Sequence, residues 1–366
     1  MTHLEENDFK EDIITSDSEN GILQGGEKDL RTVKANPNYW YPIAWSYEID
    51  RGKAHAVEFA GEPIVLVRPE NGEIFALEDR CSHRQVPLSK GVVEGQAVRC
   101  CYHGWTFDTT GKCVDVPYLG KGKLPNGVCA YPCQEQNGVV FIFPGDKTKA
   151  ATTPLPKLAE TANPDYKTRK FNPRVNCHYT FMHENLIDMN HQFLHRNIMG
   201  RIKARFLGKQ TGDNFIEVKY SFARVGNKQP LAEALIFGKH HQYEDGQQPI
   251  DEIVTIRTEY PYQTLRVTSK DGTDMISLWV CYLPQGKNQE KTKAFGLLSV
   301  KRPKTPFLID AIWPVFGLFT YKIFLEDKDI VELEQKAWID QGKKDWNVEV
   351  FPVVRDLRTV LRNNGV

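Results

Sequence analysis

Two short loops of the chain decide its architecture: Cys81-Ser82-His83 and, after sixteen further residues, Cys100-Cys101-Tyr102-His103. Each loop offers one thiolate and one imidazole, two or three positions apart. If both loops bind the same metal ion or cluster, they supply two sulfur and two nitrogen donors. This donor set suits a tetrahedral structural zinc, or a [2Fe-2S] cluster with cysteines on one iron and histidines on the other. Structural zinc sites usually pair Cys with Cys and His with His along the chain, so the alternation favours the cluster.

The chain around these loops is too long for one ordinary domain. Its 366 residues correspond to two or three domains at about 150 residues each. Hydrophobic residues make up 40% and charged residues 26%, which is enough apolar content to bury a core and excludes a wholly disordered chain. Lysine plus arginine (47) balance aspartate plus glutamate (47), so no net field draws the chain to nucleic acid. We expect no nucleic-acid partner.

The two loops belong to a series of short β-prone segments. The turn Glu70-Asn71-Gly72 predicts a hairpin between two of them, and a stretch rich in Ala, Thr and Pro, Thr148 to Pro156, predicts a linker. We therefore predict an all-β domain over residues 37–148. Its candidate strands are His55–Ala60, Ile64–Val67, Ile74–Leu77, Val98–Cys100, Val128–Cys133 and Val139–Phe143.

Residues 149–366 mix two periodicities. Helical spacing is found over Glu184–His195, Asp327–Lys343 and Val354–Arg362. Strands followed by terminal helices are typical of an α+β domain, so we predict an antiparallel sheet covered by helices. Its candidate strands are Phe215–Phe222, Ile253–Tyr260, Leu265–Thr268, Ile276–Cys281 and Ala294–Val300.

The start of the chain has a composition unlike the rest. Acids outnumber bases before residue 36, which predicts a disordered acidic tail over residues 1–36 and is typical of neither a secretory signal nor a transit peptide. The longest chargeless apolar run, Ala311 to Tyr321, spans 11 residues. A bilayer needs about 20, so we expect no transmembrane helix and a soluble, cytoplasmic protein, with peripheral membrane contact left open. The eight cysteines then serve metal binding or burial rather than disulfides.

A second group of metal-binding residue types lies between His183 and His195. On a regular helix His191 and His195 share a face, and Asp188 lies one turn before His191 on that side. Two imidazoles and a carboxylate therefore converge. This donor set suits a non-haem iron(II) that keeps coordination positions open for dioxygen.

The first pair of loops resembles the Rieske domain of the Rieske non-haem iron oxygenases, a family of ring-hydroxylating oxygenase α subunits and Rieske monooxygenases. The resemblance covers Cys-x-His-x16-Cys-x2-His and the following Gly104-Trp105. It implies that the cysteines ligate one iron of a [2Fe-2S] cluster and the histidines the other; these residues are Cys81, Cys100, His83 and His103. Two positions depart from the family pattern: Cys101, where proline is usual, and Gln85, where glycine is common. We expect Cys101 to be a packed thiol and the remaining cysteines to be buried, namely Cys113, Cys129, Cys133, Cys177 and Cys281.

The second group resembles the family's catalytic domain, with its Asn-x2-Asp-x2-His and a later histidine. The resemblance implies that His191 and His195 ligate a mononuclear Fe(II), although three residues separate them where four is more usual. The third ligand is an aspartate at the start of a later helix, for which Asp327 is our choice and Asp329 the alternative. Two further residues are expected at the catalytic centre. Asn185 lies near the iron, and the Asp188 carboxylate accepts a hydrogen bond from a ligand histidine.

The resemblance also implies a function. An external ferredoxin or flavin reductase feeds the cluster, and Asp188 bridges to the iron of a neighbouring subunit in a head-to-tail trimer. No Gly-x-Gly-x-x-Gly follows a strand, so the sequence has no sign of its own nicotinamide or flavin domain. We expect a terminal oxygenase that uses O2 to hydroxylate, or oxidatively demethylate, a hydrophobic cyclic organic substrate. The alternatives are a cis-dihydroxylating aromatic-ring dioxygenase and, from another class, a Rieske electron carrier or redox sensor without oxygenase activity.

The aromatic stretch Phe307 to Phe324 admits two interpretations. A buried apolar run ordinarily means a core or interface helix, which we favour. The functional alternative is that it roofs an apolar pocket beside the iron, and a lipophilic substrate would follow.

Overall fold

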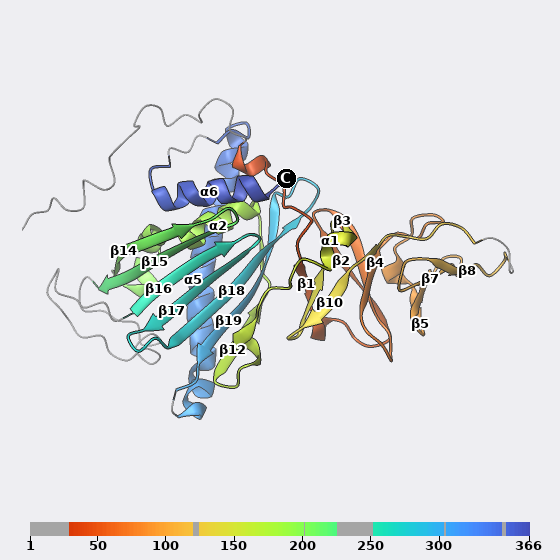
Figure 1. Ribbon diagram of the computed structural model, residues 1–366, viewed down its shortest axis with the longest axis horizontal. Helices are drawn as coiled ribbons and strands as arrows, with labels where there is room; N and C mark the ends of the chain where they lie inside the picture. Colours follow the sequence, from red (N-terminus) through yellow and green to blue (C-terminus); the bar gives the residue numbers. More distant parts are fainter. Residues whose placement is uncertain (1–28, 120–123, 201, 225–251, 304, 346–348) are drawn as a thin grey trace, which may run out of the picture.

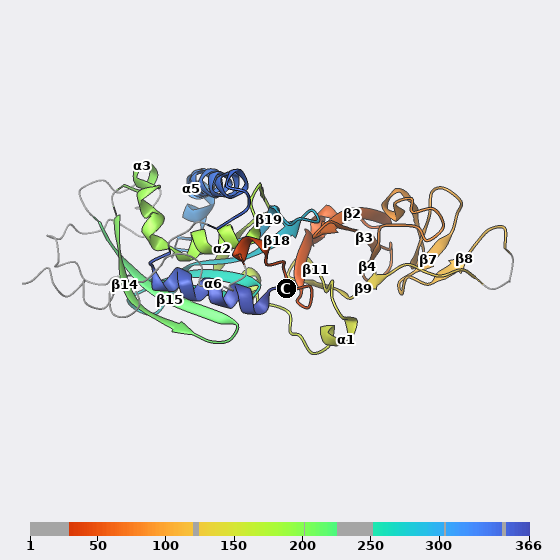
Figure 2. The same cartoon turned by 90° about the horizontal axis from the view of Figure 1, so that it is seen from above.

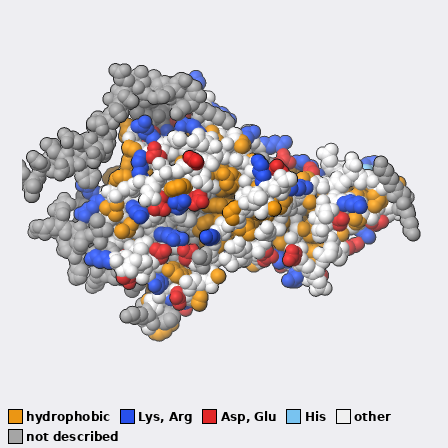
Figure 3. All heavy atoms as spheres, in the orientation of Figure 1, with side chains coloured by type: hydrophobic (Ala, Val, Ile, Leu, Met, Phe, Trp, Pro, Cys, Tyr) orange, Lys and Arg blue, Asp and Glu red, His pale blue; other side chains and the backbone are white. Residues whose placement is uncertain are grey.

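The computed structural model describes residues 29–366 except 120–123, 201, 225–251, 304 and 346–348 (Figure 1). An all-β part comes first along the chain and an α+β part follows it, and the two lie at opposite ends of the long axis. This arrangement confirms the predicted fold class. On the face seen in Figure 3, Lys and Arg side chains are intermixed with Asp and Glu over the described residues.

The all-β part is built from three small antiparallel sheets in the described residues. One sheet has the order β2 (Lys53–Phe59), β3 (Glu62–Arg68), β4 (Phe75–Glu78), β9 (Ala130–Tyr131), and another β1 (Tyr41–Trp45), β11 (Val139–Ile142), β10 (Cys133–Gln136). The pairing of β3 with β4 confirms the predicted hairpin. The single strand predicted over Val128–Cys133 is wrong, because Pro132, which has no backbone N–H to donate, separates β9 from β10.

The third sheet carries the second cysteine–histidine loop. Its order is β5 (Val92–Glu94), β6 (Ala97–Arg99), β7 (Thr106–Asp108), β8 (Cys113–Asp115). The second loop connects β6 to β7, whereas the first follows β4. Cys113, Cys177 and Cys281 are buried as predicted, but Cys101 and Cys129 are exposed and Cys133 is only half-buried, so the prediction is wrong for these three.

The α+β part is an antiparallel sheet of eight strands (Figures 1 and 2). The order is β12 (Tyr166–Phe171), β19 (Lys291–Lys301), β18 (Asp274–Gln285), β17 (Tyr262–Ser269), β16 (Glu252–Glu259), β15 (Phe215–Arg224), β14 (Ile202–Thr211), and β13 (Arg174–Val175) pairs with β19. The five predicted strands are confirmed, whereas β12, β13 and β14 were not predicted. Four helices accompany the sheet in the described residues: α2 (Tyr179–Ile187), α3 (Arg196–Met199), α5 (Pro306–Asp340) and α6 (Pro352–Asn364). A short helix, α1 (Lys147–Ala150), overlaps the predicted linker.

Two predicted helices have different bounds in the structure. The helix predicted over Glu184–His195 ends at Ile187, because the Asp188 backbone is extended and its carboxylate accepts a hydrogen bond from the Asn190 N–H, which starts a 3-10 helix over Met189–Phe193. The helix predicted from Asp327 begins at Pro306 instead. Asp327 therefore lies inside α5 and not at the start of a helix.

The predicted disordered tail is wrong for residues 29–36. Leu30 and Val33 are buried in the main core, and Arg31 forms an ion pair with Glu184 of α2. Arg358 of α6 pairs with the same carboxylate, so a buried charge network ties both ends of the described chain to α2. Residues 1–28 lie outside the described residues. None of the helices in the described part of the chain is long and apolar enough to cross a membrane.

Candidate metal centres and substrate cavity

The two cysteine–histidine loops face each other and are each closed by their own backbone hydrogen bonds. The Gln85 N–H donates to the Cys81 carbonyl at 2.8 Å, and the Gly104 N–H donates to the Cys100 carbonyl at 3.1 Å. Both donors have left-handed backbone conformations, with φ of 60° at Gln85 and 74° at Gly104. Glycine adopts this conformation without a steric cost, which is the physical reason why glycine suits position 85.

The two loops bring their cysteines into the core and their histidine rings together. Cys81 and Cys100 are buried, and the ring centroids of His83 and His103 lie 4.6 Å apart. The His83 ring stacks on Trp105 at 4.6 Å and 3°, which holds its orientation. Both Nδ1 atoms are buried without a hydrogen-bond partner in the described residues. Buried polar atoms are nearly always paired, so these two nitrogens fit a bound metal centre.

The electrostatics of Cys81 agree with this arrangement. Burial raises the pKa of the thiol to about 11, hydrogen bonds from the backbone of His83 and Arg84 oppose the shift, and the neighbouring Cys100 adds to it. The free thiol is therefore protonated at neutral pH. A metal centre bound here would displace that proton, because the thiolate is the ligand.

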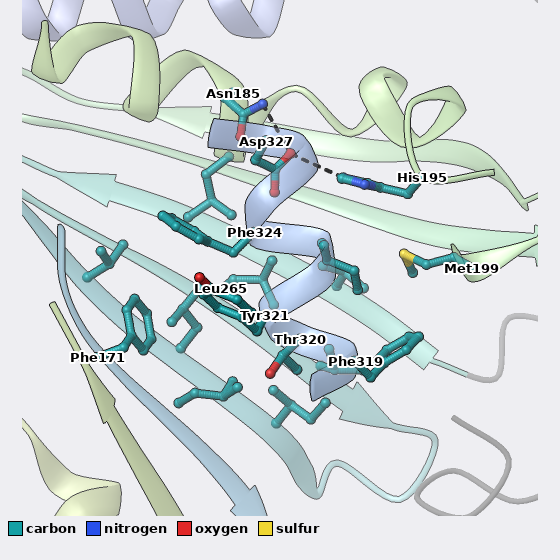
Figure 4. A pocket seen from close by; sticks show the side chains of 18 of the residues that line it. Phe171, Asn185, His195, Met199, Leu265, Phe319, Thr320, Tyr321, Phe324 and Asp327 are labelled. Carbon is teal, nitrogen blue, oxygen red and sulfur yellow. Dashed lines mark hydrogen bonds and ion pairs between the residues drawn. The ribbon is translucent and has the colours of Figure 1, made fainter. Parts of the chain in front are cut away.

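Three further donors come together from the 3-10 helix, the start of α3 and α5, and Figure 4 shows two of them, His195 and Asp327. The ligand atoms of His191, His195 and Asp327 all lie within 4.8 Å of one another. His191 Nε2 is 3.6 Å from Asp327 Oδ1, and His195 Nε2 is 3.1 Å from the same oxygen without hydrogen-bond geometry. Asp329, the alternative ligand, is exposed and not part of this group.

The other nitrogen of each histidine has its own partner. His195 Nδ1 lies 2.8 Å from Glu326 Oε2, and His191 Nδ1 contacts the main-chain carbonyl of Asp188. Both rings are thereby oriented with Nε2 toward Asp327, as metal-binding histidines are when the second ring nitrogen donates a hydrogen bond. Glu326 was missed in the sequence. Only the packing of α5 shows which acid of the pair Glu326-Asp327 faces His195 Nδ1.

The charge of His195 responds to these neighbours. Burial lowers its pKa, but the nearby carboxylates of Asp327 and Glu326 outweigh burial, so the pKa is raised above its ordinary value. His183, by contrast, is fully buried, and burial lowers its pKa to about 3. His183 is therefore neutral, and it lies outside the converging group.

The other two predicted site residues are Asn185, which contacts the converging group, and Asp188, whose carboxylate does not contact a histidine of that group. The Asn185 Nδ2 lies 3.4 Å from Asp327 Oδ1, at the edge of the group. The carboxylate of the half-buried Asp188 accepts from the Asn190 N–H, and it is the Asp188 main-chain carbonyl that contacts His191. In this structure the hydrogen bond predicted for the Asp188 carboxylate is thus made by its backbone.

A cavity of about 560 Å³ opens beside the three donors and falls within the range of about 300–1,000 Å³ usual for ligand pockets. Its floor is one face of the sheet, with Leu265, Leu278 and Leu298, and its roof is α5. Phe316, Phe319 and Phe324 line the cavity, which supports the functional interpretation of the aromatic stretch, while Phe307 is 72% exposed. Apolar side chains dominate this lining. Figure 4 shows Asp327 at one end and Phe319 and Thr320 toward the other.

Both parts of the chain match known families. Residues 39–133 match the Rieske [2Fe-2S] domain, and residues 175–354 match the vanillate O-demethylase oxygenase C-terminal domain. The 4β-methylsterol monooxygenase of Methylococcus capsulatus is 33% identical over 332 residues, which cover 85% of this chain and 84% of that protein. The oxygenase component of dicamba O-demethylase from Stenotrophomonas maltophilia is 34% identical over 162 residues, which cover 43% of this chain and 47% of that protein.

A solved structure supports the same fold. The crystal structure of dicamba monooxygenase bound to dicamba superposes with a TM-score of 0.69 and 23% identity, covering 90% of this chain and 98% of that chain. The fold and the matched domains define an oxidoreductase in which an iron–sulfur domain precedes an oxygenase domain. The chain belongs to the Rieske oxygenase family. It is a terminal oxygenase that hydroxylates or oxidatively demethylates an organic substrate, and these matches favour it over an electron carrier.

Proposed function

We propose that this oxygenase works with two iron centres and acts on a hydrophobic cyclic substrate. Cys81 and Cys100 would hold one iron of the [2Fe-2S] cluster, and His83 and His103 the other. The two unpartnered Nδ1 atoms and the buried thiols support this assignment. Imidazole in place of thiolate reduces the negative charge on such a cluster and raises its potential.

The observation that carries the proposal is the convergence of His191, His195 and Asp327 at the end of an apolar cavity. These residues would hold a mononuclear Fe(II). Iron held by two imidazoles and one carboxylate keeps coordination positions open and supplies the activation of dioxygen. Asn185, which contacts Asp327, would help to hold that carboxylate in place.

The protein's own contribution is orientation and exclusion of water. Glu326 holds the His195 ring with Nε2 inward, and the Asp188 carbonyl does the same for His191. The apolar walls of the cavity bind the substrate through burial of its hydrophobic surface. They also keep bulk water from the reacting carbon, which limits side reactions.

The arrangement of the two centres bears on the assembly. The cluster loops and the mononuclear site lie in parts of the chain at opposite ends of its long axis (Figure 1). We therefore propose a homotrimer in which the cluster loops of one subunit meet the mononuclear site of the next, with Asp188 between them. An external ferredoxin or flavin reductase would be the electron donor of this oxygenase. In support, the dicamba O-demethylase relative is itself described as an oxygenase component.

We further propose a cytoplasmic location, where reducing conditions suit the free cysteines.

The metal content tests the proposal directly. Purified protein grown with ample iron should hold about three irons per chain, two in the cluster and one mononuclear, with a low-temperature magnetic resonance signal from the reduced cluster. A preparation that contains only zinc would reject the assignment. A screen of lipophilic aromatic, terpenoid and sterol rings with a surrogate ferredoxin and reductase would then identify the substrate. Product analysis would separate a monooxygenase or demethylase from a cis-dihydroxylating dioxygenase.

A further inference from the structure

Two basic residues of β12, Arg169 and Lys170, are among those that line the mostly apolar cavity. Arg169 of β12 is half-buried and contributes to the cavity wall. Among the described residues its guanidinium has no ion pair and no hydrogen bond, whereas its strand neighbour Lys167 pairs with Asp310. Lys167 and Arg302 at this edge of the sheet thus share the carboxylate of Asp310, whereas Arg169 has no acid partner in the described residues.

The strand pattern directs Arg169 toward the cavity. Successive side chains of a strand point to opposite faces, so Arg169 and Phe171 share one face. Phe171 also lines the cavity, where Figure 4 shows its ring. Lys170 points the other way, because its Nζ lies 3.5 Å from the Gly138 carbonyl of the all-β part.

The guanidinium of Arg169 lies against α5, the helix that roofs the cavity. A β-carbon added at Gly317 of α5 would lie 2.1 Å from Arg169 Nη1, so the space occupied by the guanidinium depends on this glycine. Glycine weakens a helix interior relative to alanine, and here it makes room for a charge. Gly317 precedes Asp327 by ten residues in the same helix. At 1.5 Å per residue the two positions are about 15 Å apart along the helix axis.

An apolar ligand that fills the cavity would remove water from the Arg169 guanidinium at a cost in free energy, and an anionic group on that ligand would offset the cost. We propose that Arg169 binds a carboxylate of an otherwise apolar substrate, at the end of the cavity about 15 Å from the mononuclear site. This inference rests on the proposed function and narrows its substrate class to hydrophobic acids of about that length. A guanidinium suits the role because its planar fork of N–H donors matches a carboxylate in two hydrogen bonds.

The test compares two probes that differ only in the terminal group: dodecanoate and dodecan-1-ol, whose chains are flexible and span about 15 Å when extended. Binding to the iron-loaded enzyme is measured by calorimetry without oxygen or reductant, so that no turnover occurs. The wild-type protein should bind the acid about 10-fold more tightly than the alcohol, the effect of one charged hydrogen-bonded contact. Arg169→Gln should abolish the preference, whereas Arg174→Gln, which removes an exposed cation of β13 outside the cavity lining, should retain it.

A second variant leaves Arg169 in place. Gly317→Ala should reduce the acid preference by displacing the guanidinium, while the helix content measured by circular dichroism stays unchanged.

The proposal is overturned if the wild-type protein binds neither probe, shows no acid preference, or keeps the same preference in Arg169→Gln. Iron content reports on the proposed function separately. Three irons without an acid preference would reject only the role of Arg169, and an Arg169-dependent preference in protein that never holds mononuclear iron would reject only the oxygenase centre.

Discussion

Removal of the Glu326 carboxylate tests the mononuclear centre through a residue that is not itself a proposed ligand. Glu326 Oε2 lies 2.8 Å from His195 Nδ1, and the side chains are 28% and 4% exposed, respectively. Glu326→Ala deletes this hydrogen bond and leaves the buried ring free to change tautomer or rotate. Loss of such an orienting partner typically lowers metal affinity by about 10–100-fold, or about 1.4–2.7 kcal/mol.

The expected loss lies near the lower end of that range. Burial lowers the pKa of His195, while Asp327 and Glu326 raise it above its ordinary value. Without Glu326 the pKa falls, so protons compete less with the metal, and this gain offsets part of the lost orientation. The gain exists only at a pH below the raised pKa. The loss of affinity in Glu326→Ala should therefore increase as pH rises above it, toward the full effect.

The assay is a titration with Fe(II) or Co(II) in competition with a chelator, with the visible absorption of the cluster as an internal control. Glu326→Gln keeps an acceptor oxygen and should lose less affinity than Glu326→Ala. Asp329→Asn, an exposed acid on the same helix, is the matched control and should bind metal as the wild-type protein does. Unchanged affinity in Glu326→Ala, or a loss in Asp329→Asn, would refute this account of the site.

Three further changes probe other parts of the molecule. His191→Ala should empty the mononuclear site and abolish turnover while the cluster absorption persists; loss of both signals would mean that the segment is structural. Asp188→Asn should slow reoxidation of the reduced cluster, followed by its absorbance, at unchanged iron content, and wild-type rates would exclude a bridging role. Glu184→Leu should destabilise the protein by about 3–5 kcal/mol in denaturant, because it leaves the buried cation of Arg31 unpaired and Arg358 with only its 3.9 Å contact to Asp345. Asp340→Asn, in an exposed pair, should change stability by less than about 0.5 kcal/mol. Burial raises the pKa of Glu184, but the two arginines lower it by more, so its pKa lies below the ordinary 4.5. The stability difference between the wild-type protein and Glu184→Leu should therefore shrink as pH falls through that lowered pKa. A stability difference that stays constant with pH would contradict the charge network.

Much of the all-β part was predictable because its information is local. The Cys81 and Cys100 loops are closed by hydrogen bonds between residues four apart, and the β3–β4 hairpin follows a short turn. The missed strands of this part have three residues each or, like β1, follow no alternating pattern that marks a strand. Strands of that kind are stabilised by neighbours that are distant in the sequence, so periodicity does not reveal them.

The errors in the catalytic part have one local and one non-local cause. Helical periodicity continues through Asp188, but a local hydrogen bond from the Asn190 N–H to its carboxylate ends α2 there. The favoured helix over Phe307–Phe324 is confirmed, but the sequence did not join it to the helix predicted from Asp327. Packing of the apolar side chains against the sheet sustains one helix, α5, across Pro314 and through both segments.

The sequence by itself determined the two sets of donor residues and the family, because thiolate and imidazole spacing is a covalent property of the chain. Tertiary structure alone decided which acids and cations serve the mononuclear site: Asp327 rather than Asp329 beside the histidines, Glu326 on His195, and Arg169 against Gly317. These contacts join residues up to 148 positions apart, from β12 to α5. Only the burial of α5 against the sheet brings such residues within reach of one another, and no short-range pattern encodes that distance.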